Sequence, residues 1–279
     1  MSSISVAALW RYPVKSMAGE SLTQSAFSVS GLDGDRAYAM VDGENRVGSA
    51  KLVKAFGGLL HWQAGFKGPA AAGQKPPVRL SHPDGRQIDS DAPDAAATIA
   101  AAFGADVAFH AVPPPGLKLA FAPGTLGGLH AQTTEFPVSS ASPENTFFDL
   151  APLLIVAGAT LRALAGGEGT DACIKRLRPN LVLEDPVASA FVENSWVGRR
   201  LAIGPEVVIK VIIACPRCVM PNLSRADLPP DPGFLRRVAQ ANTCDLGDFG
   251  HLPCAGSYAT VETGGMVHQG DSVRVLEDG

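Results

Sequence analysis

The chain has 279 residues, enough for two domains or one large β-rich domain, and its apolar content of 46% supports a hydrophobic core. Its 30 Gly and 22 Pro indicate many turns and short elements rather than long helices. The net charge is −4 and no block of Lys and Arg occurs, which argues against a nucleic-acid partner. No apolar run is long enough to span a membrane, and the first 15 residues lack the pattern of a signal peptide. We therefore expect a cytoplasmic protein with no membrane or nucleic-acid partner.

The first half of the chain predicts short strands separated by turns. Gly and Asp mark turns at residues 31–35 and 42–45, and strands are expected at residues 5–11, 22–29 and 36–41. This spacing favours a β-barrel or a β-sandwich. Residues 91–104 predict one short helix, with Asp91 as its N-cap and Gly104 at its exit.

A linker is predicted at Pro113-Pro114-Pro115-Gly116, and the stretch from 117 to 146 is weakly patterned and loop-like. Beyond it, residues 159–164 predict a helix, and strands are expected at residues 153–156, 181–183, 200–203, 207–213, 258–262 and 272–276. The expected fold is therefore mainly β with some α, divided into domains 1–116 and 117–279.

The tetrapeptide Cys215-Pro216-Arg217-Cys218 follows an apolar run typical of a buried strand. Two thiols at this spacing are compatible with a zinc site, a redox-active dithiol or simple packing of buried thiols. A zinc site would need two further ligands, for which Cys244, Cys254 and His251 are available at an unusually long spacing. A thioredoxin-like dithiol would need a following helix, and Pro221 argues against one.

Several polar residues at expected strand ends and turns lack a visible counter-ion in the sequence. Lysine, arginine, serine and asparagine side chains can together hold a phosphate or another anionic group. Neither a G-x-x-x-x-G-K loop nor a G-x-G-x-x-G loop occurs, so a P-loop or a Rossmann site is not expected. The residues concerned are Lys15, Ser16, Arg36, Lys51, Arg178 and Asn180.

Several segments in register resemble the MOSC proteins and the β-barrel domain that precedes the MOSC domain in that family. In the first half the resemblance lies in Tyr12-Pro13-Val14-Lys15-Ser16, in Gly31-Leu32-x-Gly34-Asp35-Arg36 and in Ser49-Ala50-Lys51. In the second half it lies in residues 176–182 (RLRPNLV), 194–198 (NSWVG), 214–218 (ACPRC), 256–258 (GSY) and 270–273 (GDSV). The resemblance implies an N-terminal β-barrel-like domain, a MOSC β-barrel domain and a cofactor cleft between them.

The resemblance also implies that the protein binds the molybdenum cofactor, a pterin dithiolene with a phosphate tail. By motif position, Cys218 is the implied molybdenum ligand and catalytic residue, and thiolate is a chemically suitable ligand for such a metal. Cys215 matches a variable position near the site, and Arg217 lies between the two thiols. The residues that match positions holding the pterin and its phosphate are Lys15, Ser16, Arg36, Arg178 and Asn180, and Lys51 is assigned to the same site.

The resemblance to amidoxime-reducing members implies a reductase of hydroxylamines, amidoximes and N-hydroxy bases, which yields amines and amidines. No flavin, nicotinamide or ferredoxin motif is found, so a separate flavin, iron–sulfur or cytochrome protein would supply the electrons. One departure affects the substrate side: Leu150 and Ala151 stand where those members have polar residues. The alternative function is a molybdenum-cofactor or sulfur carrier that forms a persulfide on Cys218.

Overall fold

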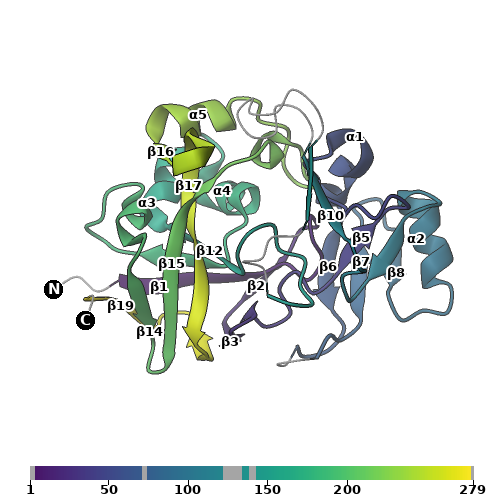
Figure 1. Ribbon diagram of the computed structural model, residues 1–279, viewed down its shortest axis with the longest axis horizontal. Coiled ribbons are helices and arrows are strands. Elements are labelled where there is room, and N and C mark those ends of the chain that lie inside the picture. Colours follow the sequence, from purple (N-terminus) through teal and green to yellow (C-terminus); the bar gives the residue numbers. More distant parts are fainter. Residues whose placement is uncertain (1–3, 71–73, 122–133, 138–142, 278–279) are drawn as a thin grey trace.

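The computed structural model of the protein describes residues 4–70, 74–121, 134–137 and 143–277. Seven strands pair in a closed ring and form a β-barrel, because β12 pairs with both β13 and β17 (Figure 1). In order around the ring the strands are β12 (Leu153–Ala157), β13 (Leu181–Glu184), β1 (Ile4–Arg11), β19 (Ser272–Leu276), β14 (Arg200–Ile203), β15 (Val207–Pro216) and β17 (His251–Thr263).

Alternation of apolar residues explains the barrel interior. In β15 the side chains of Val207, Ile209 and Val211 are buried in the barrel core, as a period of two requires. Further along β15 the pairing with β17 is interrupted by bulges between Val211 and Ile213 and between Ala214 and Pro216. Since a bulge bends a strand locally, β15 is bent where it enters the cysteine tetrapeptide, whose first two residues still belong to the strand.

Three helices cover one outer face of the barrel. The parallel strands β12 and β13 need a crossover connection, which α3 (Gly158–Leu164) and α4 (Gly169–Leu177) supply. With α5 (Phe234–Ala241) these helices enclose a second apolar cluster that includes Leu161, Leu177 and Phe234. No helix of the described ranges has the length and hydrophobicity that crossing a membrane requires.

The N-terminal part beyond the first strands has its own apolar core, around Met40, Leu59 and Trp62. It lies on the right in Figure 1. Its elements are β5 (Ala39–Val41) paired with β9 (Ala108–His110), the sheet of β6 (Gln63–Phe66), β7 (Val78–Ser81) and β8 (Gln87–Asp89), and the helices α1 (Val53–Phe56) and α2 (Ala95–Phe103).

The two halves of the sequence interlock. Strand β1 lies within the barrel, β2 (Glu20–Leu22) pairs with it, and β3 (Gln24–Ser28) pairs with β4 (Gly31–Leu32) and with β18 (Gly265–His268). Strands of the segment 4–32 thus pair with strands of the second half of the chain. The division at residue 116 stays a prediction, whereas the expected mainly β fold with some α is confirmed.

Several predicted elements differ in extent from those observed. The strand expected at residues 22–29 is two strands that break at Thr23, and only Ala39–Val41 of the strand expected at 36–41 is formed. Arg36 accounts for the latter difference, because its φ of 46° is incompatible with a strand. Helix α2 begins at Ala95, and Asp91, its expected cap, instead pairs with Lys67.

Several regions for which no element was predicted contain helices or strands. Helix α4 was not predicted, and it ends directly before Arg178. Within the stretch expected to be a loop, β10 (Lys118–Phe121) pairs with β11 (Thr134–Pro137). The rest of that stretch lies partly outside the described residues.

Candidate functional site

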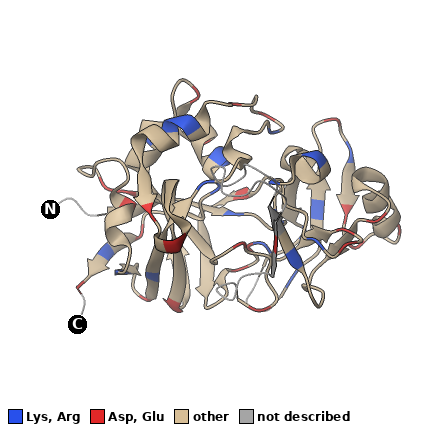
Figure 2. Cartoon of the chain, turned by 45° about the horizontal axis from the view of Figure 1, so that its top comes forward, with Lys and Arg blue, Asp and Glu red and all other residues tan. Residues whose placement is uncertain are grey.

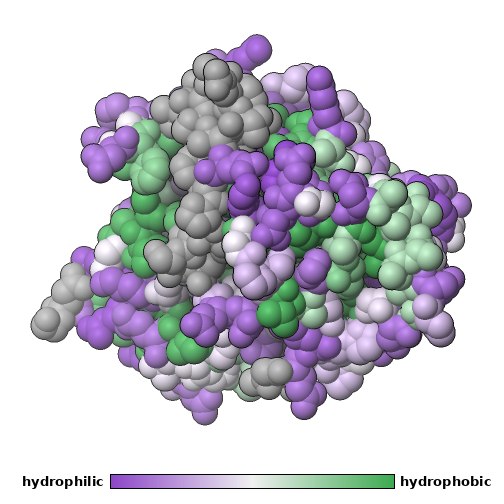
Figure 3. Space-filling view, turned by 45° about the vertical axis from the view of Figure 1, so that its right-hand side comes forward, coloured by the Kyte–Doolittle hydropathy of each residue, from purple (hydrophilic) through white to green (hydrophobic). Residues whose placement is uncertain are grey.

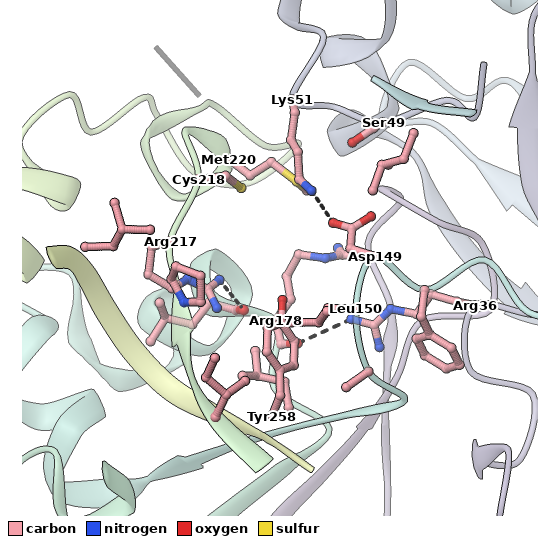
Figure 4. Close-up of a pocket in the computed structure, with 18 of the residues that line it drawn as sticks. Arg36, Ser49, Lys51, Asp149, Leu150, Arg178, Arg217, Cys218, Met220 and Tyr258 are labelled. Carbon is pink, nitrogen blue, oxygen red and sulfur yellow. Dashed lines mark hydrogen bonds and ion pairs between the residues drawn. The ribbon is translucent and has the colours of Figure 1, made fainter. Parts of the chain in front are cut away.

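A cavity of about 900 Å³ lies where the N-terminal part meets the barrel (Figure 4). Its lining combines residues 15–51 with residues from the end of β15, the end of α4 and the start of β12. The residues assigned to the site from the sequence line it, with the exception of Cys215: Lys15, Ser16, Arg36, Lys51, Arg178, Asn180, Arg217 and Cys218.

The two cysteines of the tetrapeptide have different surroundings. Cys218 is partly exposed and lines the cavity, whereas Cys215 is 1% exposed and lies behind it. The guanidinium of Arg217 donates a hydrogen bond to Cys215 Sγ at 3.1 Å and another to the carbonyl of Leu177 at 2.8 Å. Of the two, Cys218 is therefore the thiol that a ligand in the cavity can reach.

Arg217 keeps a positive charge between the two thiols. Burial works against that charge, but Cys215, Tyr258 and Cys218 together raise the pKa of Arg217 above its ordinary value. Its Nε atom is buried and has no hydrogen-bond partner among the described residues. A charged group with a free donor beside a thiol favours an anionic ligand or a thiolate.

Two lysines meet one carboxylate on the opposite wall. Lys15 Nζ lies 2.5 Å from Asp149 Oδ1, and Lys51 pairs with the other carboxylate oxygen. Figure 4 shows Lys51 and Asp149 facing one another. Burial would raise the pKa of Asp149, but Lys15 and Lys51 outweigh it and hold that pKa well below its usual range. Burial in turn lowers the pKa of Lys15, although Asp149 opposes the shift.

Two arginines stack on one tyrosine. The guanidinium carbons of Arg36 and Arg178 lie 4.4 Å and 4.2 Å from the centre of the Tyr12 ring. Burial, with the charge of Arg36 adding to it, lowers the pKa of Arg178 to about 9. Two cations held this close in a buried place indicate that the site is built for an anion.

Backbone strain is concentrated at the same site. Ser16, Arg36 and Arg178 have φ values of 68°, 46° and 61°, in the left-handed region that non-glycine residues rarely occupy. Arg178 takes this conformation as the residue that ends α4. Strained residues that gather around a cavity are typical of a binding site.

The end of α4 is held by arginines. Arg225 donates hydrogen bonds to the carbonyls of Lys175 and Arg176 at 3.0 Å and 3.2 Å, next to the bond from Arg217 to Leu177. Cations are stabilised at a helix C-terminus, where carbonyls lack partners and the dipole is negative. Burial nevertheless lowers the pKa of Arg225 to about 10.

Asn180 and Ser16 have largely structural partners. Asn180 donates to Asp35 at 2.9 Å and accepts a hydrogen bond from the backbone of Leu154 at 3.1 Å. The Ser16 hydroxyl accepts from the backbone of Ala50 at 3.0 Å, so its own proton remains available to a ligand.

The lining as a whole carries an excess of positive charge, and blue segments from both halves face the middle of the molecule in Figure 2. The carboxylates are Asp149 and Asp248, and the cations are Lys15, Arg36, Lys51, Arg176, Arg178 and Arg217. A soft thiol, a cluster of cations and a volume of this size fit a phosphate-bearing cofactor whose metal takes sulfur ligands.

The zinc and dithiol alternatives for the cysteine pair gain no support, whereas Cys215 packs in an apolar cluster as a buried thiol. In the part of the chain that the structure describes, no three Cys, His, Asp or Glu side chains converge as a zinc site needs. After Cys218 the chain forms only a short 3₁₀ turn, Met220–Asn222, and not the helix of a thioredoxin-like dithiol.

The sequence did not indicate several residues of the cavity. Asp149 forms the central ion pair, Tyr12 carries the two arginines, and Tyr258 lines the wall. Burial raises the pKa of Tyr258 well above its ordinary value, so its hydroxyl keeps its proton. The available signal was that Tyr12 and Tyr258 lie within segments that resemble the family.

Comparison with known proteins gives the family. The MOSC domain model matches residues 142–274, and the MOSC N-terminal beta barrel domain model matches residues 3–101. The chain is 31% identical to the mitochondrial amidoxime reducing component 2 of Bos taurus over 147 residues, which is 50% of this chain and 41% of that protein. It is 29% identical to the mitochondrial amidoxime-reducing component 1 of Homo sapiens over 139 residues, or 47% of this chain and 38% of that protein.

The chain thus spans about two fifths of the length of these curated relatives. Among solved structures, the YuaD protein of Bacillus subtilis matches 99% of this chain and 97% of its own with a TM-score of 0.42 and 13% identity. The two family models follow one another along the chain, and residues from both matched regions line the cavity. This chain therefore belongs to the MOSC-domain proteins that carry a MOSC N-terminal β-barrel domain.

Proposed function

We propose that the cavity binds the molybdenum cofactor and that the protein is an oxidoreductase for N-hydroxylated compounds such as amidoximes and hydroxylamines. The observation that carries the proposal is the partly exposed thiol of Cys218 in a buried cavity with an excess of cations. The names of the curated relatives, which describe amidoxime reduction, support the same reaction class.

In this proposal the cavity is the cofactor cleft between domains 1–116 and 117–279. Cys218 would ligate the metal, and Arg217 would stabilise the thiolate through its adjacent charge. The phosphate and the pterin would be held by Lys15, Ser16, Arg36, Lys51, Arg178 and Asn180, with Cys215 positioning Arg217. When bound, the cofactor would supply the two-electron chemistry that removes oxygen from an N–O bond.

The chain's own residues would bind the cofactor and balance its negative charge. The buried cations would neutralise the phosphate, and the protonated Tyr258 hydroxyl can donate a hydrogen bond into the cavity. Electrons would come from a separate flavin, iron–sulfur or cytochrome protein. A cytoplasmic location also remains a prediction, since the named relatives are mitochondrial.

The test uses protein expressed in a host supplied with molybdate. We expect molybdenum close to one equivalent per chain and reduction of benzamidoxime to benzamidine with an artificial electron donor. The alternative, a cofactor or sulfur carrier, is compatible with the same accessible thiol. A persulfide on Cys218 without molybdenum or turnover would favour the carrier, and zinc without molybdenum would contradict both functions.

A further inference from the structure

One side of the cavity is mostly apolar and comes from a single hairpin. Strands β16 (Thr243–Asp245) and β17 form this hairpin, and its residues Leu246, Phe249 and Leu252 line the cavity together with one carboxylate, Asp248. The cations of the lining come from other elements. The cavity therefore has one wall suited to an anion and another suited to an apolar group.

Phe249 stands out among the apolar residues at the surface. Its side chain is 64% exposed, and it is the one aromatic residue among the large apolar residues that the described ranges leave exposed. None of the others in that group, which include Val187, Val197 and Met266, lines the cavity. Because the ring of Phe249 lines the cavity and is exposed as well, it is available to pack on a ligand that enters the cavity.

The backbone fixes the position of this ring. Leu246 N donates to Gly250 O at 3.0 Å, and Gly250 N donates to Gly247 O at 2.8 Å. Gly247 and Gly250 have φ values of 63° and 71°, which allow the tight connection without strain. Phe249 is thus presented by a hydrogen-bonded turn.

The hairpin also lies directly beside the thiol. Arg217 N donates to Pro253 O at 2.9 Å, so the residue before Cys218 is bonded to the strand that follows Phe249. Leu252 lies between Phe249 and Pro253 in the sequence, and its buried side chain lines the same cavity. An apolar group that packs on this hairpin would therefore be close to Cys218.

We infer that the β16–β17 hairpin selects the substrate, with Phe249 packing on a flat aromatic body while the N-hydroxy group of the same molecule enters toward Cys218. This inference rests on the proposed function and narrows its substrates to N-hydroxylated compounds with an aromatic ring. Leu150, which also lines the cavity, adds a further apolar side chain to the lining.

The test compares two substrates with the same reacting group, benzamidoxime and acetamidoxime, in the molybdenum-loaded protein. In Phe249→Ala we expect kcat/KM for benzamidoxime to fall about tenfold, mainly through KM, since a ring contact contributes on that scale. Acetamidoxime should change less than twofold, and Phe249→Tyr should retain the wild-type values. Val187→Ala, an exposed apolar residue that does not line the cavity, is the control and should change neither substrate.

An equal loss of kcat/KM for both substrates would overturn the inference, because Phe249 would then act on the hairpin structure or on docking of the electron donor. An unchanged kcat/KM for both substrates would overturn it as well. Isothermal titration with benzamidoxime gives a readout without turnover, and the dissociation constant should rise about tenfold in Phe249→Ala. If the wild type reduces neither compound, the proposed function fails, yet this titration still decides the role of Phe249: weaker binding in the variant supports it, and equal or absent binding rejects it.

Discussion

Cys215 and Cys218 lie three residues apart and have opposite surroundings. Cys215 is buried and bonded to Arg217, whereas Cys218 faces the cavity. The difference comes from the end of β15, where Pro216 still pairs with Cys254 and Cys218 has left the ladder. A ligand that needs one accessible thiolate is therefore favoured over one that needs both thiols.

Asp149 is a second single residue on which the cavity depends, because it neutralises two lysines. It bridges Lys15 and Lys51, and without it two buried ammonium groups would face one another. Asp149→Asn should lower the free energy of unfolding at pH 7 by about 3 kcal/mol, the usual cost of breaking a buried ion pair.

This loss should depend on pH. Because the folded protein holds the pKa of Asp149 below its unfolded value, the contribution is complete above about pH 4 and disappears as the pH falls through the lower, folded value. Urea denaturation at pH 7 and pH 3 measures it. Asp89, which also lies between two cations, is the control, and Asp89→Asn should cost much less because its partners Lys67 and Arg79 are far more exposed than Lys15 and Lys51. Equal losses in the two variants, or a loss that is larger at pH 3 than at pH 7, would contradict this account.

At the scale of elements, Arg176 ties α4 to the segment that follows Cys218. It is fully buried, pairs with Glu168 through two bonds of 2.8 Å, and donates to the carbonyls of Pro221 and Pro229 at 2.9 Å and 2.8 Å. This one side chain therefore holds a segment that has little regular structure of its own. The cavity wall that includes Met220 depends on it.

Replacing Arg176 by Met should lower the free energy of unfolding by about 3 kcal/mol, because Glu168 and the two carbonyls lose their partner. Arg162→Met is the matched control: Arg162 also makes two bonds of 2.8 Å to one carboxylate, that of Glu184, but it is exposed. Chemical denaturation should show a much smaller loss of the free energy of unfolding in Arg162→Met. Similar losses in the two variants would mean that the burial of Arg176 does not increase the stability that its contacts contribute.

The sequence predicted the barrel elements well, because each has a clear local pattern. Residues 200–203 are an apolar run after Arg200, residues 272–275 alternate polar and apolar side chains, and the two segments form β14 and β19 as expected. Helix α4 was missed because its short segment, GTDACIKRL, mixes polar and apolar residues and includes a glycine and two poor helix formers. Its burial against α3 and the arginines at its end stabilise it, and a local pattern cannot reveal such contacts.

At the scale of the whole molecule, the cavity exists because distant segments interlock. Lys15 and Lys51 come from the first fifth of the chain, whereas Asp149, Arg178 and Cys218 come from the second half. The sequence indicated the cations through motifs, but the Asp149 ion pair and the Tyr12 stack depend on pairing across more than 90 residues. Such contacts become visible only in the folded chain.

The surface outside the cavity is mixed. On the face drawn in Figure 3, apolar residues occur in separate groups divided by hydrophilic ones. Among the described residues of that face, no broad apolar patch explains how an electron donor would bind. The cavity and its rim at the β16–β17 hairpin remain the features of the described chain that most clearly point to function.

X-ray absorption at the molybdenum edge tests the central claim most directly, with wild-type protein and Cys218→Ala both loaded with cofactor. The account predicts equal molybdenum content in the two proteins and one sulfur ligand fewer in the variant, with reduction of benzamidoxime lost. Cys215→Ala, which removes the buried thiol behind Arg217, should keep the full set of sulfur ligands. An unchanged sulfur shell and full activity in Cys218→Ala would contradict the assignment of Cys218 as the metal ligand.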